Sequence, residues 1–360
     1  MKRAWAKFQR WFNWIALAAT ALGVVLAVRS QWDAILGLEW GRSWQVIVIG
    51  ALAFAVPPIV QAFAFWVSLR LLGVRAPLAE TMVVWGRSFV VRYAPTGALS
   101  VVYRVRAKDR LGATAQQVLV ATTYEHLGAL ASGALVCVLA FALAGGAPPL
   151  LGVGIALPVA ALAIATRPRF SGPLLRRLAK HFGMDQPPLL RGRQLAAVVG
   201  LTSLGWIGTA VGTYVLVGGL TPGTPPSAAW LTGTWAVGYL VGFVVPFLPG
   251  GLGAREGALV AVYAGRFGAT AATALVLSAR LVTTLGEAVA VALIELAYLT
   301  TKAARARTGA PGRGAVVCSG GAAARDPDAR ARLARRDRLG RRNLRARYDG
   351  GQGRPARARG

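Results

Sequence analysis

The sequence predicts an all-α polytopic membrane protein, with about six transmembrane helices and two re-entrant helical hairpins arranged as an inverted repeat. Composition is the first reason: 55% of the 360 residues are hydrophobic and 15% are charged, whereas soluble domains carry about 25% charged residues. Apolar stretches long enough to span a bilayer are the second reason. The third is a pair of Pro- and Gly-rich breaks inside apolar sequence, each followed by a similar short string.

Six stretches are apolar over the roughly 20 residues that a spanning helix needs. They lie at about 11–28, 44–69, 115–143, 148–166, 194–217 and 270–299. Two further apolar stretches, at about 78–103 and 229–265, contain the breaks. Backbone broken by Pro and Gly is tolerated at membrane depth only where it lines a protein cavity or a water-filled path. We therefore expect each of these two stretches to enter the membrane and return on the same side.

Lys and Arg accumulate in cytoplasmic loops, and their positions orient the chain. Four lie in residues 1–10, four in 104–110 and seven in 167–193, whereas the loops 144–149 and 218–228 contain none. With six spans, this asymmetry places both termini in the cytoplasm, as in a multi-pass protein of the inner (cytoplasmic) cell membrane. The first hairpin then opens to the cytoplasm and the second to the outside.

Two similar strings indicate the repeat. RLGAT at Arg110–Thr114 and RFGAT at Arg266–Thr270 each precede a long apolar stretch. They follow the breaks at Tyr93–Gly97 and Pro249–Gly257 at similar distances. Repeats with interrupted helices are typical of membrane transporters, so we expect the two halves to have the same fold in opposite orientations.

The chain divides into a transmembrane domain, residues 1–300 with repeat halves at about 44–143 and 194–299, and a tail, residues 301–360. The tail holds 17 Lys or Arg and 4 Asp or Glu, against 24 and 9 in the rest of the chain. Because the tail lacks an apolar period, we expect it to be disordered, cytoplasmic and drawn to anionic lipid. Specific nucleic-acid binding is not indicated, since positive charge alone binds non-specifically. A tail without any function is the alternative.

Two predicted spans contain ionisable residues near their centres, where a charge costs about 2.5–3.5 kcal/mol on insertion scales. Tyr124 and Glu125 lie in the first, and Arg280 and Glu287 lie in the second. Superposing the two strings puts Tyr124 opposite Arg280, with both about 15 Å into their helices. We expect Glu125 and Arg280 to form an ion pair between the halves. This pair either only holds helices together, or Arg280 binds an anionic headgroup while Glu125 orients it or binds a cationic group or a proton.

The second break is a candidate phosphate site. Its candidate residues are Pro249, Gly250, Gly251, Gly253, Arg255 and Glu256. The glycines allow close backbone approach, and a helix that restarts after them would point its positive dipole end into the break. In the alternative interpretation, the glycines only permit a tight turn in the membrane, and Arg255 and Glu256 form a local charge pair.

The first break has basic side chains around it. The candidate residues there are Arg87, Arg92, Pro95, Gly97 and Arg104. The arginines either collect phospholipid phosphates at the inner leaflet or extend to the interface as snorkelling anchors.

The histidines and cysteines indicate neither a metal site nor a disulfide framework. His126 and His181 lack metal-ligand spacing, and we expect His126 to be a hydrogen-bonded packing residue. Cys137 and Cys318 are the two cysteines, too few for a disulfide framework or a thiolate metal site. We expect no cofactor.

The string Pro249–Gly257, followed by an apolar helix and Arg280, resembles the hallmark of the lysylphosphatidylglycerol synthase transmembrane region, also called the flippase-like family. Arg92–Gly97, the basic run to Arg110 and Tyr124–His126 resemble the first half of that region. Within the first of these strings, Thr stands where a second Gly is usual.

The resemblance covers about residues 10–300 and implies lipid handling. It implies transport between leaflets of an anionic or aminoacylated phospholipid, or of a polyprenyl-phosphate-type lipid, with a separate lipid-modifying enzyme as a further partner. The soluble aminoacyl-transfer domain of the bifunctional members is not found in this sequence, so we expect no synthase activity. One alternative is a membrane-embedded lipid-dependent transferase, for which Glu125, His126 and Glu256 supply only a loose acid–base set. The other is a non-catalytic membrane accessory or scaffold protein.

Overall fold

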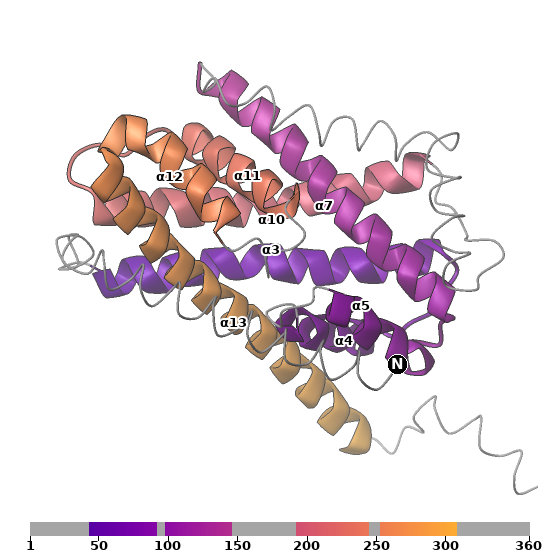
Figure 1. The fold of residues 1–360 in the computed structure, drawn as a ribbon. Helices are drawn as coiled ribbons and strands as arrows, with labels where there is room; N and C mark the ends of the chain where they lie inside the picture. The colour runs from indigo at the N-terminus through magenta and orange to yellow at the C-terminus, as the bar shows by residue number, and fades with distance from the viewer. Residues whose placement is uncertain (1–42, 92–97, 146–191, 245–252, 308–360) are drawn as a thin grey trace, which may run out of the picture. The chain divides into compact units, whose positions relative to one another are not determined.

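The computed structural model describes residues 43–91, 98–145, 192–244 and 253–307, and every regular element in these ranges is a helix (Figure 1). The long helices are α3 (Ser43–Leu71), α7 (Ala115–Leu143), α10 (Gly192–Leu220) and α13 (Ala269–Arg307). These four are long and apolar enough to cross a membrane, as the sequence predicts for the stretches they occupy. The expected spans at 11–28 and 148–166 lie outside the described residues.

Shorter helices occupy the two stretches that contain the breaks. A first pair, α4 (Leu78–Val91) and α5 (Ala98–Arg106), flanks the first break, and a second pair, α11 (Ala228–Val244) and α12 (Ala254–Phe267), flanks the second. The two helices of each pair contact each other. In Figure 1 the second pair is drawn above α3 and the first pair below it. The short helix α6 (Lys108–Leu111) leads from the first pair to α7. We call the helices α3 to α7 the first half and the helices α10 to α13 the second half.

The repeated strings form comparable turns before the last long helix of each half. Gly112 ends α6 with a φ of 62°, and Gly268 ends α12 with a φ of 79°, values that favour glycine. A Cβ at either position would meet no atom within 4 Å, so the requirement for glycine is conformational. In the first turn, the Thr114 hydroxyl accepts a hydrogen bond from the Gln117 amide at 3.1 Å and caps α7.

The first long helices of the two halves, α3 and α10, pack antiparallel through glycines of α10. A Cβ at Gly208 would lie 2.4 Å from the carbonyl oxygen of Ala53, and a Cβ at Gly219 would lie 2.4 Å from the side chain of Val46. Residue numbers therefore rise along α10 where they fall along α3. Small residues permit this close approach of the two backbones.

Each pair of short helices packs against the last long helix of the other half. Gly86 of α4 faces Ile294 of α13, and Gly233 of α11 faces Phe141 of α7. The first pair starts where α3 ends, and the second starts where α10 ends. Because α3 and α10 are antiparallel, the two pairs start from opposite ends of the bundle.

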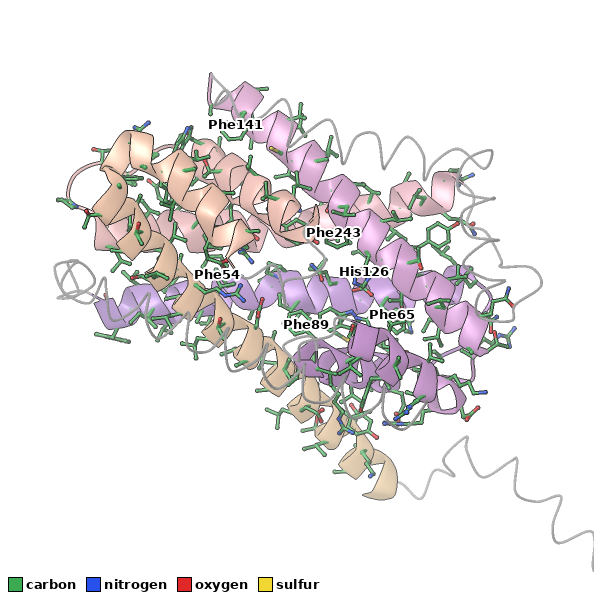
Figure 2. All side chains as sticks on the ribbon, in the orientation of Figure 1. Phe54, Phe65, Phe89, His126, Phe141 and Phe243 are labelled. Carbon is green, nitrogen blue, oxygen red and sulfur yellow. The ribbon has the colours of Figure 1, made fainter. Side chains whose placement is uncertain are left out.

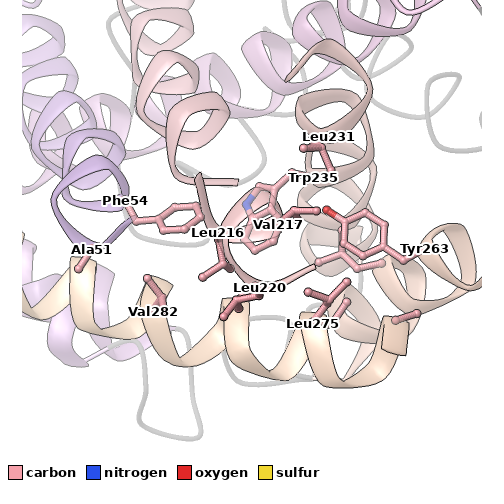
Figure 3. Packing of buried hydrophobic residues seen from close by; sticks show 14 residues of the cluster. Ala51, Phe54, Leu216, Val217, Leu220, Leu231, Trp235, Tyr263, Leu275 and Val282 are labelled. Atoms are coloured by element: carbon pink, nitrogen blue, oxygen red, sulfur yellow. The ribbon is translucent and has the colours of Figure 1, made fainter. Parts of the chain in front are cut away.

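The two largest apolar clusters among the described residues hold these helices together. The first joins α3, α10, α11, α12 and α13, and Figure 3 shows Phe54 of α3 beside Trp235, with Val282 of α13 and Tyr263 of α12 in the same cluster. The second joins α3, α4, α6, α7 and α13. Both α3 and α13 thus contribute to the two clusters and connect the halves.

Candidate functional site

A buried ion pair joins the first pair of short helices to α7. Nη1 of Arg104 on α5 donates a hydrogen bond to Oε2 of Glu125 on α7, and their side chains are 4% and 3% exposed. Trp85 of α4 donates its Nε1–H to Oε1 of Glu125 at 2.8 Å. Nε of Arg104 donates to the Ser88 hydroxyl at 2.8 Å. Both carboxylate oxygens therefore have donors, as a buried charge requires.

Aromatic rings surround the guanidinium of Arg104. Its central carbon lies 4.9 Å from the ring centre of Phe65 and 5.6 Å from that of Trp85, within the range of cation–π attraction. Phe89, which stacks on Trp85 at 4.7 Å, and Phe65 are labelled in Figure 2. The sequence interpretation of Arg104 as a phosphate collector or a snorkelling anchor is wrong for this structure, because Glu125 holds the side chain in the interior.

A second ion pair occupies the corresponding place in the other half. Oε1 of Glu256 on α12 and Nε of Arg280 on α13 lie 3.7 Å apart, and their side chains are 17% and 15% exposed. Oε2 of Glu256 accepts a hydrogen bond from the Gly253 amide at 2.7 Å. A carboxylate therefore already lies at the N-terminus of α12, where the helix dipole favours negative charge. This amide, which the sequence interpretation made available to a phosphate, is bound by the protein itself.

The predicted ion pair between Glu125 and Arg280 is wrong, since each of these residues has a partner within its own half. Glu125 pairs with Arg104, and Arg280 pairs with Glu256. The sequence superposition aligned α7 with α13 through the strings that precede them. It could not show which residues of the neighbouring short helix pack beside each long helix. That helix supplies the partner in both cases, Arg on α5 and Glu on α12.

A cavity of about 90 Å³ lies where the two halves meet, and its lining comes from α3, α4, α7, α10, α11, α12 and α13. The polar lining residues are Gln61, Ser132, Thr202, Thr209, Arg255, Thr283 and Glu287. The aromatic lining residues are Phe54, Phe89, Trp206, Trp235 and Tyr239. A basic and an acidic side chain therefore share one cavity with hydroxyl groups and aromatic rings.

Of the predicted site residues that the structure describes, Arg255 and Glu287 line this cavity. The guanidinium carbon of Arg255 lies 4.7 Å from the ring centre of Trp235, and Trp235 stacks on Phe54 at 5.5 Å. Glu287 enters from α13 and is buried. Arg280 contacts Glu256 and is not a lining residue of the cavity.

Three other residues that the sequence singles out have structural contacts. Arg87 makes a two-pronged ion pair with Glu295 of α13, with N–O distances of 2.6 and 3.0 Å. Tyr124 is buried in a small apolar cluster with Leu195 of α10. Nδ1 of His126 lies 2.7 Å from the carbonyl oxygen of Thr122, which confirms its prediction as a hydrogen-bonded packing residue. Figure 2 labels this histidine.

Sequence reasoning missed the lining residues that carry no charge. Pro57 and Pro58 stand inside α3, and proline inside a helix removes backbone hydrogen bonds. This pair inside a predicted span is the signal that could have indicated a cavity wall. Ser132, Thr209 and Tyr239 give no such signal, because single hydroxyls are common in spanning helices.

The remaining predicted site residues lie outside the described part of the chain. They are Arg92, Pro95, Gly97, Pro249, Gly250 and Gly251. Gly253, the last glycine of the second break, is described and has a φ of 89° immediately before α12.

Comparison with known proteins identifies the family. A search of curated protein sequences gives no match to this chain. The family model described as the lysylphosphatidylglycerol synthase TM region matches residues 13–290, a range that includes the residues named above as lining the cavity. This protein is an integral membrane, lipid-related protein and belongs to the lysylphosphatidylglycerol synthase TM region family.

Proposed function

We propose that this protein is a transporter that moves a phospholipid or a polyprenyl-phosphate-type lipid between the leaflets of the cell membrane. The observation that carries the proposal is the cavity lined by Arg255 and Glu287 together with residues of both halves. A site at the meeting of two repeats is the usual place for a transported substrate. Family membership supports a lipid as that substrate.

In this proposal, both pairs of short helices are re-entrant hairpins within an inverted-topology repeat. The antiparallel packing of α3 and α10 supports opposite orientations of the two halves. The basic residues at 104–110, next to the first pair, support a cytoplasmic opening for that hairpin. Both termini then lie in the cytoplasm.

The headgroup would cross through the cavity while the acyl chains stay in the surrounding lipid. Apolar side chains on the outer surface of α10 support this division, since Leu204 and Ile207 are 54% and 62% exposed. Contact with acyl chains would make this exposure favourable. The charged groups of the headgroup would instead meet Arg255, Glu287 and the hydroxyl groups of the lining.

Leaflet exchange in proteoliposomes tests the proposal. The purified protein is reconstituted with acyl-labelled phosphatidylethanolamine, phosphatidylglycerol, aminoacyl-phosphatidylglycerol or a polyprenyl phosphate, and the outer-leaflet label is reduced chemically. We expect exchange of at least one lipid in the wild-type protein and its loss in Arg255→Gln. Arg266→Gln is the matched control, because Arg266 lies on the same helix and stacks on Trp230 at 5.6 Å but does not line the cavity.

Absence of exchange for all four lipids, with correct folding and insertion, would contradict the transport proposal. Turnover of a lipid into a new product by the same proteoliposomes would favour a transferase. A variant that ends at residue 307 separates transport from a scaffold role, because a transporter keeps most of its exchange rate without the tail.

A further inference from the structure

We infer that the contact between α4 and α13 is a latch, whose polar side chains hold the two halves together at one end of the bundle and separate when the cavity opens there. This inference rests on the proposed transport function, because it names the contact between the halves that moves during transport. Three observations carry it: the charged groups in this contact, its position beside the cavity, and its difference from the contact between α7 and α11.

The latch consists of polar contacts between α4 of the first half and α13 of the second. Arg87 and Glu295 form an ion pair with N–O distances of 2.6 and 3.0 Å, and their side chains are 41% and 28% exposed. Closer to the start of α4, Glu80 accepts a hydrogen bond from the Tyr298 hydroxyl at 3.1 Å. Its other carboxylate oxygen accepts one from Arg110 of α6 at 2.7 Å. Because ion pairs between partly exposed groups contribute little to stability, the latch can separate at a small cost.

The latch lies beside the cavity on both helices. Phe89, which Figure 2 labels, follows Arg87 on α4 and lines the cavity. On α13, the cavity residue Glu287 precedes Glu295 by about two helical turns. Since α4 and α13 both contribute to the cavity wall, moving one away from the other at the latch widens the cavity toward this end of the bundle. In the orientation proposed above, this end faces the cytoplasm.

Apolar packing adds little to the contact between α4 and α13. Of the described residues of α13, Ile294 is the one that is buried in the second apolar cluster. A Cβ at Gly86 of α4 would lie 3.5 Å from Cγ2 of Ile294, which is an ordinary van der Waals distance. The two helices therefore touch here without interlocking, and the polar groups of the latch hold them together.

The contact between α7 and α11 also joins the two halves, but it is apolar and interlocked. The ring of Phe141 occupies the space beside Gly233, where a Cβ would lie 2.8 Å from the ring. The buried residues of this contact are at most 5% exposed, and they are Ala134, Cys137, Phe141, Ala236, Val237 and Leu240. Opening the cavity here would bring these side chains into a polar environment, which is unfavourable. The latch is therefore the contact that separates.

A reversible disulfide tests whether the latch must separate. The Cβ positions of Gly86 and Ile294 lie 4.0 Å apart, within the range that a disulfide requires. The variant Gly86→Cys/Ile294→Cys is made in a protein without Cys318, and the exchange of the four acyl-labelled lipids is followed in proteoliposomes. We expect oxidation to abolish exchange and a reducing agent to restore it. Undiminished exchange by the oxidised protein would overturn the inference and leave the transport proposal intact.

Gly218→Cys/Pro225→Cys is the matched control for the disulfide. These two Cβ positions lie 3.7 Å apart. Gly218 is near the end of α10 and Pro225 is in the connection to α11, so this disulfide lies within the second half and does not join it to the first. We expect equal exchange before and after its oxidation. Equal losses of exchange in the two variants would overturn the inference, because the effect would then not depend on the latch.

Thiol labelling inside the cavity tests the latch without relying on lipid exchange. Ser132 lines the cavity and is 1% exposed, so Ser132→Cys should react slowly with a hydrophilic thiol reagent. The protein without Cys318 is labelled in nanodiscs, where the reagent reaches both faces of the membrane. Adding Glu295→Gln breaks the ion pair and should raise the labelling rate about fivefold, the population shift expected for the loss of one partly exposed ion pair.

Exchanging the two charges is the control for this labelling, and the result is independent of transport. Arg87→Glu/Glu295→Arg recreates the ion pair and should return the labelling rate toward the wild-type value. A rate that rises in Glu295→Gln and falls again with exchanged charges supports the latch even if no lipid is exchanged, in which case only the transport proposal fails. A wild-type labelling rate in Glu295→Gln would overturn the inference even if lipids are exchanged.

Discussion

The carboxylate of Glu256 and the guanidinium of Arg280 lie 3.7 Å apart between α12 and α13. In the first half, the corresponding helices α5 and α7 are joined in the same way by Arg104 and Glu125. The charges are exchanged: the short helix carries the base in the first half and the acid in the second. The first pair is almost completely enclosed, whereas the second is longer and partly exposed. This difference leads to the first prediction.

Removing the charge of Glu125 should destabilise the protein far more than removing that of Glu256. Glu125→Gln leaves the enclosed guanidinium of Arg104 without its counter-ion, and breaking a buried pair in this way costs about 3–5 kcal/mol. Glu256→Gln keeps an acceptor for the Gly253 amide and breaks a looser contact, so its cost should be smaller. Thermal unfolding in detergent, followed by size-exclusion chromatography, measures both, and equal losses of stability would contradict the prediction.

Arg280→Ala should abolish lipid exchange while the amount of protein in the membrane stays normal. Arg280 does not line the cavity, but it contacts Glu256 beside Arg255, and we expect it to position the start of α12. Arg280→Lys, which keeps the positive charge, should recover much of the exchange rate. Normal lipid exchange by Arg280→Ala at normal protein abundance would contradict the proposal that Arg280 positions the start of α12.

Two glycine substitutions on α10 should have opposite effects. Gly208→Ala places a Cβ 2.4 Å from the Ala53 carbonyl oxygen, and overpacking of this kind costs about 1–3 kcal/mol. At Gly200 a Cβ meets no atom within 4 Å, so Gly200→Ala should be neutral or stabilise the helix by up to about 1 kcal/mol. The melting temperatures of the two variants provide the measurement. A stable Gly208→Ala protein would show that α3 and α10 do not approach so closely.

Cysteine labelling should place the connections of the two halves on opposite sides of the membrane. Arg75 lies between α3 and α4 and Thr224 lies between α10 and α11, and both are exposed. In a variant without Cys318, whose remaining Cys137 is buried, Arg75→Cys should react only with a reagent that reaches the cytoplasm. Thr224→Cys should react with an impermeant reagent added outside intact cells. Labelling of both from one side would exclude the inverted arrangement.

Local composition was sufficient to predict the four long helices that the structure describes. Apolar length alone places a span at about 44–69, and the structure has α3 at Ser43–Leu71. The second break was recognisable because Pro and Gly interrupt an apolar run, and the short helices begin and end around it. These features depend on local composition, which a single sequence contains.

The partners of the charged residues could not be predicted in the same way. Which residue meets Glu125 depends on the direction in which α5 turns back toward α7, and no local pattern fixes this direction. The cavity is a further example, because Glu287 of α13, Gln61 of α3 and Ser132 of α7 share it only after the halves have packed. Glu287 could be recognised in the sequence because it is a charged residue in a predicted span. Gln61 and Ser132 are uncharged, and only the packed structure shows that they line the cavity.

The two prolines of α3 interrupt the backbone hydrogen bonds of this helix where it lines the cavity. Pro57 and Pro58 lack their amide hydrogens as a matter of covalent structure, so no rearrangement of the helix can supply a donor to the carbonyl groups of Ala53 and Phe54 from these positions. The Ala53 carbonyl oxygen lies where α10 comes close, 2.4 Å from the position of a Cβ at Gly208. The missing hydrogen bond of α3 and the glycine of α10 therefore meet at one place, and the contact between the two long helices depends on both residue types.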